Sequence, residues 1–69
     1  MASRSPARAA VVVLVTCPTV ASARRIASHL IARRLAACVN LVPGVESTFR
    51  WQGKVQRCRE TLLLIKTTA

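Results

Sequence analysis

Nearly half of this chain is predicted to form one long β-hairpin, and this feature limits most strongly the folds it can adopt. Residues 37–51 are rich in β-branched and aromatic residues and contain "PG" at 43–44, which indicates a bulge within a strand. "QGK" at 52–54 is typical of a tight turn, since Gly53 can adopt a positive φ. A further extended segment, residues 55–67, starts with the polar "QRCRET" and ends with the apolar "LLLIK". This contrast indicates a hairpin whose tip is solvated and whose base enters a core.

A strand and a helix are predicted ahead of the hairpin. Residues 10–16, "AVVVLVT", are continuously apolar and β-branched, which is typical of a strand covered on both faces. Apolar residues then recur with helical spacing over residues 20–35. Thr19 is the expected N-cap, with Ser22 as the alternative.

The predicted order is therefore strand, helix, strand, strand. A right-handed connection places the helix on one face of the sheet and leaves the first strand at an edge. This order is the first part of the ferredoxin-like βαββαβ motif, with the second helix and last strand missing. We expect an α+β, ferredoxin-like domain over residues 10–69 that is incomplete, preceded by a disordered basic tail at residues 1–9.

The composition indicates a partner. At 69 residues the chain can form one small domain, yet 52% of its residues are hydrophobic. Part of this apolar surface is expected to be buried against another subunit or a missing segment. Eleven Lys and Arg residues against two acids give a net charge of +9. Because the basic residues occur singly or in pairs, we favour a solvated basic face over a nucleic-acid-binding surface.

Thiol content and missing motifs narrow the function further. The three cysteines form no CxxC pair and no Cys/His zinc spacing, which favours free thiols in a reducing cytoplasm.

The start "MASRSPAR" before "AAVVVLVTC" resembles a signal peptide, but the valine-rich run favours a buried strand. No apolar stretch approaches the roughly twenty residues of a membrane span. Without paired carboxylates, a Ser-His-Asp set or a glycine-rich phosphate loop, we expect no enzyme.

Three stretches resemble one known family. The runs "VVVLVTCP", "RLAACVNLVPGVESTFRWQGKV" and "LLLIKTT" are similar to the CutA family of divalent-cation-tolerance proteins, in register over residues 11–68. The resemblance implies a ferredoxin-like subunit in a tight homotrimer, with long second and third strands that reach neighbouring subunits. It also implies a non-catalytic role in tolerance to copper and other divalent cations.

Two cysteines are candidate metal ligands. Cys38, in "AACVN", matches a family cysteine, and Cys17 ends the first strand. The thiolate of either residue would suit Cu(I). Some family members place a copper-associated cysteine where this sequence has Val15, so that ligand does not carry over directly, although Cys17 would share its strand face. The competing interpretation of both is a small buried side chain, which we favour for Cys38. For Cys17 the metal interpretation has more weight, because the residue lies at a strand end near a helix N-terminus.

Other notable residues are expected to have structural or solvent-exposed roles. Cys58 is predicted to be a surface thiol, and His29 a solvated histidine on the polar helix face. Phe49 and Trp51 beside Arg50 could form a stacking platform for single-stranded nucleic acid, but packing at the hairpin is favoured.

The leading hypothesis is a cytoplasmic CutA-like homotrimer that binds copper or another divalent cation and takes part in the response to metal ions. This hypothesis predicts that the protein binds neither a membrane nor a nucleic acid. The alternatives are a small basic nucleic-acid-binding module and, with less support, a thiol redox protein.

Overall fold

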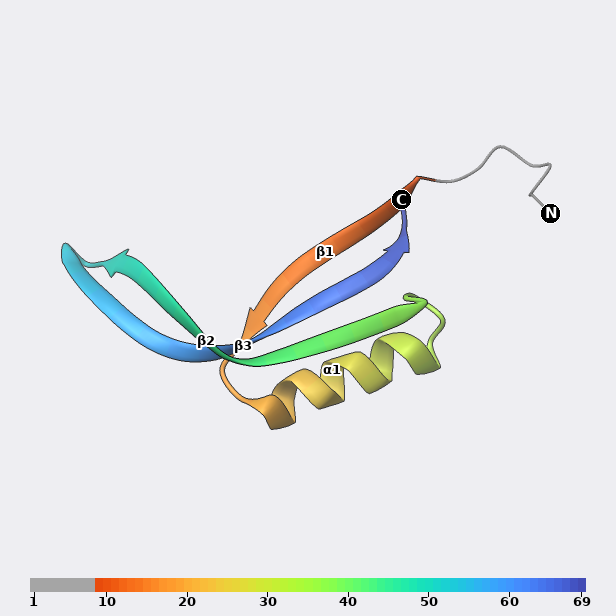
Figure 1. Cartoon of the computed structure of the whole chain (residues 1–69), viewed down its shortest axis with the longest axis horizontal. Helices are drawn as coiled ribbons and strands as arrows, with labels where there is room; N and C mark the ends of the chain where they lie inside the picture. The colour runs from red at the N-terminus through yellow and green to blue at the C-terminus, as the bar shows by residue number, and fades with distance from the viewer. Residues whose placement is uncertain (1–8) are drawn as a thin grey trace.

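The computed structural model describes residues 9–69, so the predicted disordered tail lies almost entirely outside the described residues. Four elements follow one another along the chain: β1 (Ala10–Cys17), α1 (Val20–Ala32), β2 (Cys38–Trp51) and β3 (Lys54–Thr68). The strands form an antiparallel sheet in the order β1-β3-β2, and α1 covers one face of it (Figure 1). The predicted βαββ arrangement, with β1 at a sheet edge, is confirmed.

β2 and β3 form a hairpin that extends far beyond the helix (Figure 1). We call residues 45–60 the hairpin arm and the rest of the sheet, together with α1, the body. The arm is closed by Gln52 and Gly53, whose φ angles are 51° and 76°. Positive φ at both central residues is typical of a type I′ turn, whose twist matches that of the flanking strands. The predicted turn at "QGK" is therefore confirmed.

A bulge at Gly44 separates the arm from the body. Val42 pairs with Leu62. The next pair is Val45 with Glu60, so β2 has one more residue than β3 between the two pairs. Gly44 has a φ of 75°, a conformation that favours glycine. Because side chains alternate along a strand, the extra residue keeps Val42 and Val45 on the same sheet face.

The start of α1 is capped as predicted. Thr19 has an extended backbone, and its Oγ1 accepts a hydrogen bond from the Ser22 backbone N–H at 3.0 Å. The Ser22 hydroxyl oxygen accepts one from the Thr19 N–H at 3.3 Å, which completes a reciprocal capping box. The alternative that Ser22 is the N-cap is wrong, because Ser22 is already the third helical residue.

The helix ends at Ala32, earlier than the predicted end at Leu35. The N–H of Arg34 donates to the Ile31 carbonyl at 3.0 Å, and the N–H of Leu35 donates to the Leu30 carbonyl at 2.9 Å. These two bonds form a Schellman motif, in which the left-handed position is commonly glycine but is here Arg34, with φ 58°. The apolar spacing continues through this cap, which is why periodicity alone placed the end too late.

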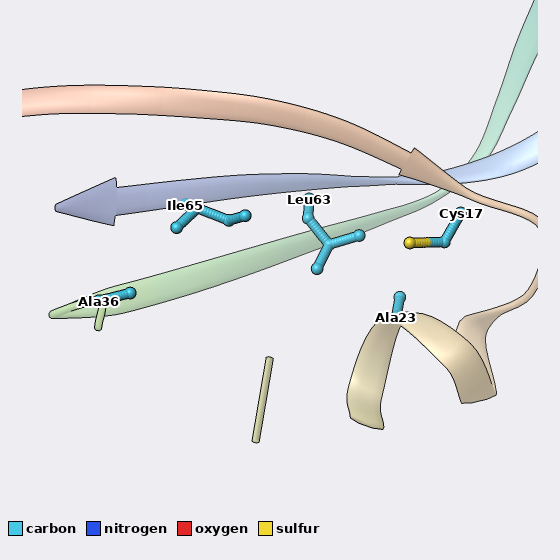
Figure 2. Close-up of a cluster of buried hydrophobic side chains, with 5 residues drawn as sticks. All are labelled: Cys17, Ala23, Ala36, Leu63 and Ile65. Atoms are coloured by element: carbon cyan, nitrogen blue, oxygen red, sulfur yellow. The ribbon is translucent and has the colours of Figure 1, made fainter. Parts of the chain in front are cut away.

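The core lies between α1 and the sheet (Figure 2). Leu63 on the central strand β3 and Ala23 on α1 are fully buried. The small Ala23 side chain lets the helix approach the sheet closely. The buried hydrophobic residues are Cys17, Ala23, Ala36, Leu63 and Ile65. This set is small, so the body depends heavily on Leu63.

The sheet face turned away from α1 has no cover within residues 9–69. Alternation and register assign a row of apolar side chains to it, interrupted on the arm by Ser47 and Cys58. We call this row the open face: Val12, Leu14, Val42, Val45, Phe49, Trp51, Leu62 and Leu64. Leu14 is 64% exposed and Trp51 59% exposed. The pattern of β1 predicted cover on both of its faces, whereas the described residues cover only the side of α1.

Candidate functional site

Cys17, the first candidate ligand, lies inside the core. It ends β1, pairs with Thr61 of β3 and is 3% exposed. Its thiol lies near Ala23 and Leu63, which supply no donor atom for a metal (Figure 2). Val15 shares its sheet face, as predicted, and packs against the same core. In this position the main role of Cys17 is that of a small side chain packed in the core.

Cys38, the second candidate ligand, lies at the start of β2 and is exposed. The expected burial of its side chain is wrong for residues 9–69, because the sheet face on which Cys38 lies carries no covering element there. Its Sγ atom lies 4.0 Å from Asn40 Oδ1, two residues along the same face. Lys66 is its partner on β3, and an ammonium group beside the thiol disfavours a cation there.

The fold does not bring Cys17 and Cys38 together within one subunit. Cys17 pairs with Thr61 and Cys38 with Lys66, so they lie on opposite sheet faces. Their partners are separated by about 16 Å along β3 at the usual strand rise. Ligands of one ion lie within a few Å of each other. Among residues 9–69 no group of three or more His, Cys, Asp and Glu side chains gathers around a common point.

Cys58 and His29 are exposed, as predicted. The pairing of Cys58 with Ser47 puts its thiol on the open-face side of the arm, whereas its neighbours Arg57 and Arg59 lie on the other side. The same alternation separates Arg50 from the aromatic residues of the arm. The stacking platform considered from the sequence, with Arg50 beside the aromatic rings, is therefore not formed.

Two shallow hollows flank α1. One, of about 410 Å³, lies between the helix and β2 and is lined by Ala27, Ser28, Ile31, Ala32 and Val39. The other, of about 280 Å³, lies beyond the end of the helix, and its lining includes Arg34, Thr67 and Thr68. Neither lining includes a carboxylate, a cysteine or a histidine, so neither offers a metal site or an acid–base pair.

The open face is not evident from the strand patterns on the two sides of "PG" taken separately. The extra residue at the bulge changes the alternation, so that Val42 and Val45 share one face. The "PG" pair, which indicates a bulge, is the sequence signal that could have revealed this face. Among residues 9–69, no helix has both the length and the apolar character that crossing a bilayer requires.

Comparison with known proteins identifies the family. A family model described as CutA1 divalent ion tolerance protein matches residues 11–69. The divalent-cation tolerance protein CutA of Thermus thermophilus is 58% identical over 57 residues, which are 83% of this chain and 55% of that protein. The chloroplastic protein CutA 1 of Oryza sativa is 49% identical over 67 residues, which are 97% of this chain and 38% of that protein.

A solved structure shows the same fold. The divalent cation tolerance protein (Cut A1) of Thermus thermophilus superimposes with a TM-score of 0.84 at 55% identity, covering 87% of this chain and 58% of that one. The chain thus spans roughly half the length of the relatives from Thermus thermophilus that it matches. The predicted resemblance and the predicted α+β, ferredoxin-like βαββ fold are both confirmed. The chain belongs to the CutA1 divalent ion tolerance family.

Proposed function

We propose that this chain acts in tolerance to divalent cations, as a non-catalytic protein that works as a homotrimer. The observation that carries the proposal is the family match across residues 11–69. The relative from Thermus thermophilus is named a divalent-cation tolerance protein, a name that describes tolerance and not a reaction. The two hollows beside α1, which lack acid–base residues, fit a non-catalytic role.

The open face supports self-association. It presents apolar side chains along both the body and the arm, including Leu14 at 64% and Trp51 at 59% exposure. Burying one large apolar side chain contributes about 1.5–3 kcal/mol, so a row of this length can hold subunits together. The choice of three copies follows the resemblance to the family, in which long hairpins reach neighbouring subunits.

Cys38 is the better candidate for a metal ligand of this chain. Its thiol is exposed on the sheet face that assembly would use, whereas the Cys17 thiol is enclosed by apolar neighbours. A soft thiolate suits Cu(I) better than a hard divalent cation such as Mg²⁺. Assembly would supply the further ligands that the single subunit does not gather.

We also propose that the protein is cytoplasmic. Cys17, Cys38 and Cys58 are all free thiols, and free thiols persist in a reducing compartment. Fractionation of cells that express the intact protein, with antibody detection, tests this assignment. Recovery in an oxidising compartment with the cysteines paired would contradict it.

The mass of the intact protein in solution, measured by light scattering in reductant, tests the assembly. We expect three copies, and we expect Leu14→Asp to shift the mass towards one copy because it puts a charge on the open face. Ile26→Asp, at a position of α1 that is 38% exposed and lies away from the open face, is the matched control and should leave the mass unchanged. A wild-type monomer, or equal effects of the two variants, would contradict the assembly.

The cellular role and the metal site are tested separately from assembly. Cells that lack the gene should become sensitive to copper and should recover with the wild-type gene. Cys38→Ser should weaken Cu(I) binding measured with a competing chelator, whereas Cys58→Ser should not. If the gene with Cys38→Ser restores copper tolerance, the cellular role is supported and Cys38 is not needed for it.

A further inference from the structure

The fold separates the charges of the chain onto two sides of the sheet. The side of α1 carries seven of the nine Lys and Arg residues within 9–69, with Glu46 as its one acid. These basic residues are Arg24, Arg25, Arg33, Arg34, Arg50, Arg57 and Arg59. The open-face side carries Lys54, Lys66 and Glu60. Most basic residues within 9–69 are thus scattered along the sequence but share the α1 side of the sheet.

Three of these arginines lie close together on the arm. Arg57 and Arg59 are two residues apart on β3, so they share a face at a Cα separation of about 7 Å. Arg57 pairs with Thr48, which makes Arg50 its diagonal neighbour across the strands, also about 7–8 Å away. We call Arg50, Arg57 and Arg59 the arginine face.

At the end of the arginine face nearest the body, the Arg59 side chain lies over the bulge, where Gly44 has no side chain. The Arg59 guanidinium extends over Gly44, where its Nη1 lies 3.9 Å from the position that a Cβ would take. Glu46 pairs with Arg59 at this end and offsets one of the three charges. The net charge of the arginine face is therefore positive, and all three arginines are exposed.

The shape of this surface favours a polymer over a small anion. The arginines lie on a protruding two-stranded ribbon (Figure 1), and the two hollows beside α1 are lined by residues of the body. Guanidinium groups form paired hydrogen bonds with phosphate oxygens and fit repeated phosphates well. The major groove of a nucleic acid duplex of B-form accepts a two-stranded ribbon.

The position of the aromatic residues distinguishes duplex from single-stranded nucleic acid. Proteins that bind single strands stack bases on aromatic rings beside a basic groove. Here Phe49 and Trp51 lie on the opposite face of the ribbon from Arg50. The arginine face can therefore contact phosphates but has no aromatic ring on which to stack a base. A duplex offers phosphate contacts of this kind.

We propose that the arginine face binds the phosphate backbone of duplex DNA without sequence preference. The surface does not overlap the open face, so a homotrimer would present three arginine faces at once. The proposal does not depend on the metal-tolerance function. A result that contradicts one of the two does not contradict the other.

Fluorescence anisotropy of a labelled, mixed-sequence DNA duplex, titrated with the intact protein over a range of salt concentrations, tests the proposal. We expect the Arg50→Gln, Arg57→Gln, Arg59→Gln variant to bind about tenfold more weakly or worse at low salt, since it loses three phosphate contacts. The slope of log K against log salt should fall by about three. Replacing the same residues with lysine should retain most of the slope.

The matched control removes the same charge elsewhere on the same side. Arg24→Gln, Arg25→Gln, Arg33→Gln should weaken binding less than threefold. Equal losses in the two triple variants would mean that net charge alone attracts the duplex, and this would overturn the proposal. So would an intact protein that does not bind the duplex, or one that binds polyglutamate more tightly. Circular dichroism and light scattering confirm that each variant retains its fold and mass.

Discussion

The body and the arm of this protein have the same strand chemistry but very different surroundings. In the body, α1 covers one sheet face and buries Leu63 fully. In the arm, the same two strands continue with no third element from residues 9–69, and Phe49 and Trp51 stay 42% and 59% exposed. A two-stranded hairpin is only marginally stable in water unless something packs on it. The comparison shows that alternating patterns make strands, whereas burial needs a further element.

The largest expected difference between the two regions is the cost of removing an apolar side chain. Leu63→Ala should lower the free energy of unfolding by about 2–5 kcal/mol, because it leaves a cavity in a small core. Chemical denaturation, followed by circular dichroism, measures this cost. It should be independent of protein concentration, since Leu63 is buried within its own subunit.

Phe49→Ala is the matched change in the arm. If the proposed assembly covers Phe49, the cost of this change should rise with protein concentration. A concentration-independent cost as large as that of Leu63→Ala would mean that the arm is packed against its own chain. The contrast between body and arm would then disappear.

A smaller effect is expected at the tip of the arm. Gly53→Ala should destabilise the protein by about 1 kcal/mol, because an L-residue with a side chain is strained in the left-handed conformation. No atom lies within 4 Å of the Cβ that would be added, so the cost is conformational and not steric. Gly53→Asn should cost less, since asparagine tolerates this conformation. Equal stabilities of wild type and Gly53→Ala, by thermal unfolding, would mean that the turn contributes nothing.

The smallest effect has the opposite sign and belongs to the body. Arg34 takes the left-handed position of the Schellman motif at φ 58°. Arg34→Gly should therefore stabilise the protein by about 0.5 kcal/mol, as the relieved strain outweighs the greater freedom of glycine in the unfolded chain. Arg33→Gly is the control, because Arg33 has a φ of −88° and gains no such relief. A lower melting temperature for Arg34→Gly than for wild type would contradict this assignment.

Sequence reasoning succeeded where local chemistry decides the structure. The N-cap at Thr19 and the turn at Gly53 follow from side-chain capping and from the backbone freedom of glycine. The end of α1 was placed too late because the Schellman cap at Arg34 has no glycine to mark it. Periodicity continues through such a cap, so it gives no signal there.

The candidate site was less predictable than the fold. Cys17 and Cys38 were grouped by residue type, but strand register places them on opposite faces of the sheet. The sequence predicted scattered basic residues on a solvated face, and only strand pairing makes Arg50 a diagonal neighbour of Arg57 across the turn. Which of these side chains lie together depends on the register between strands. The spacing of residues along one strand gives no information about that register.

The sequence alone determined the order of elements, the cap of the helix, the tight turn of the hairpin and the likeness to the CutA1 family. These features depend on residues within a few positions of one another, or on direct similarity. Only the tertiary structure decided which residues share a face, since this follows from the register of β1 and β2 on β3 and from the extra residue at the bulge. A shift of one residue would exchange the two faces of a strand, and with them the burial and charge of every side chain on it.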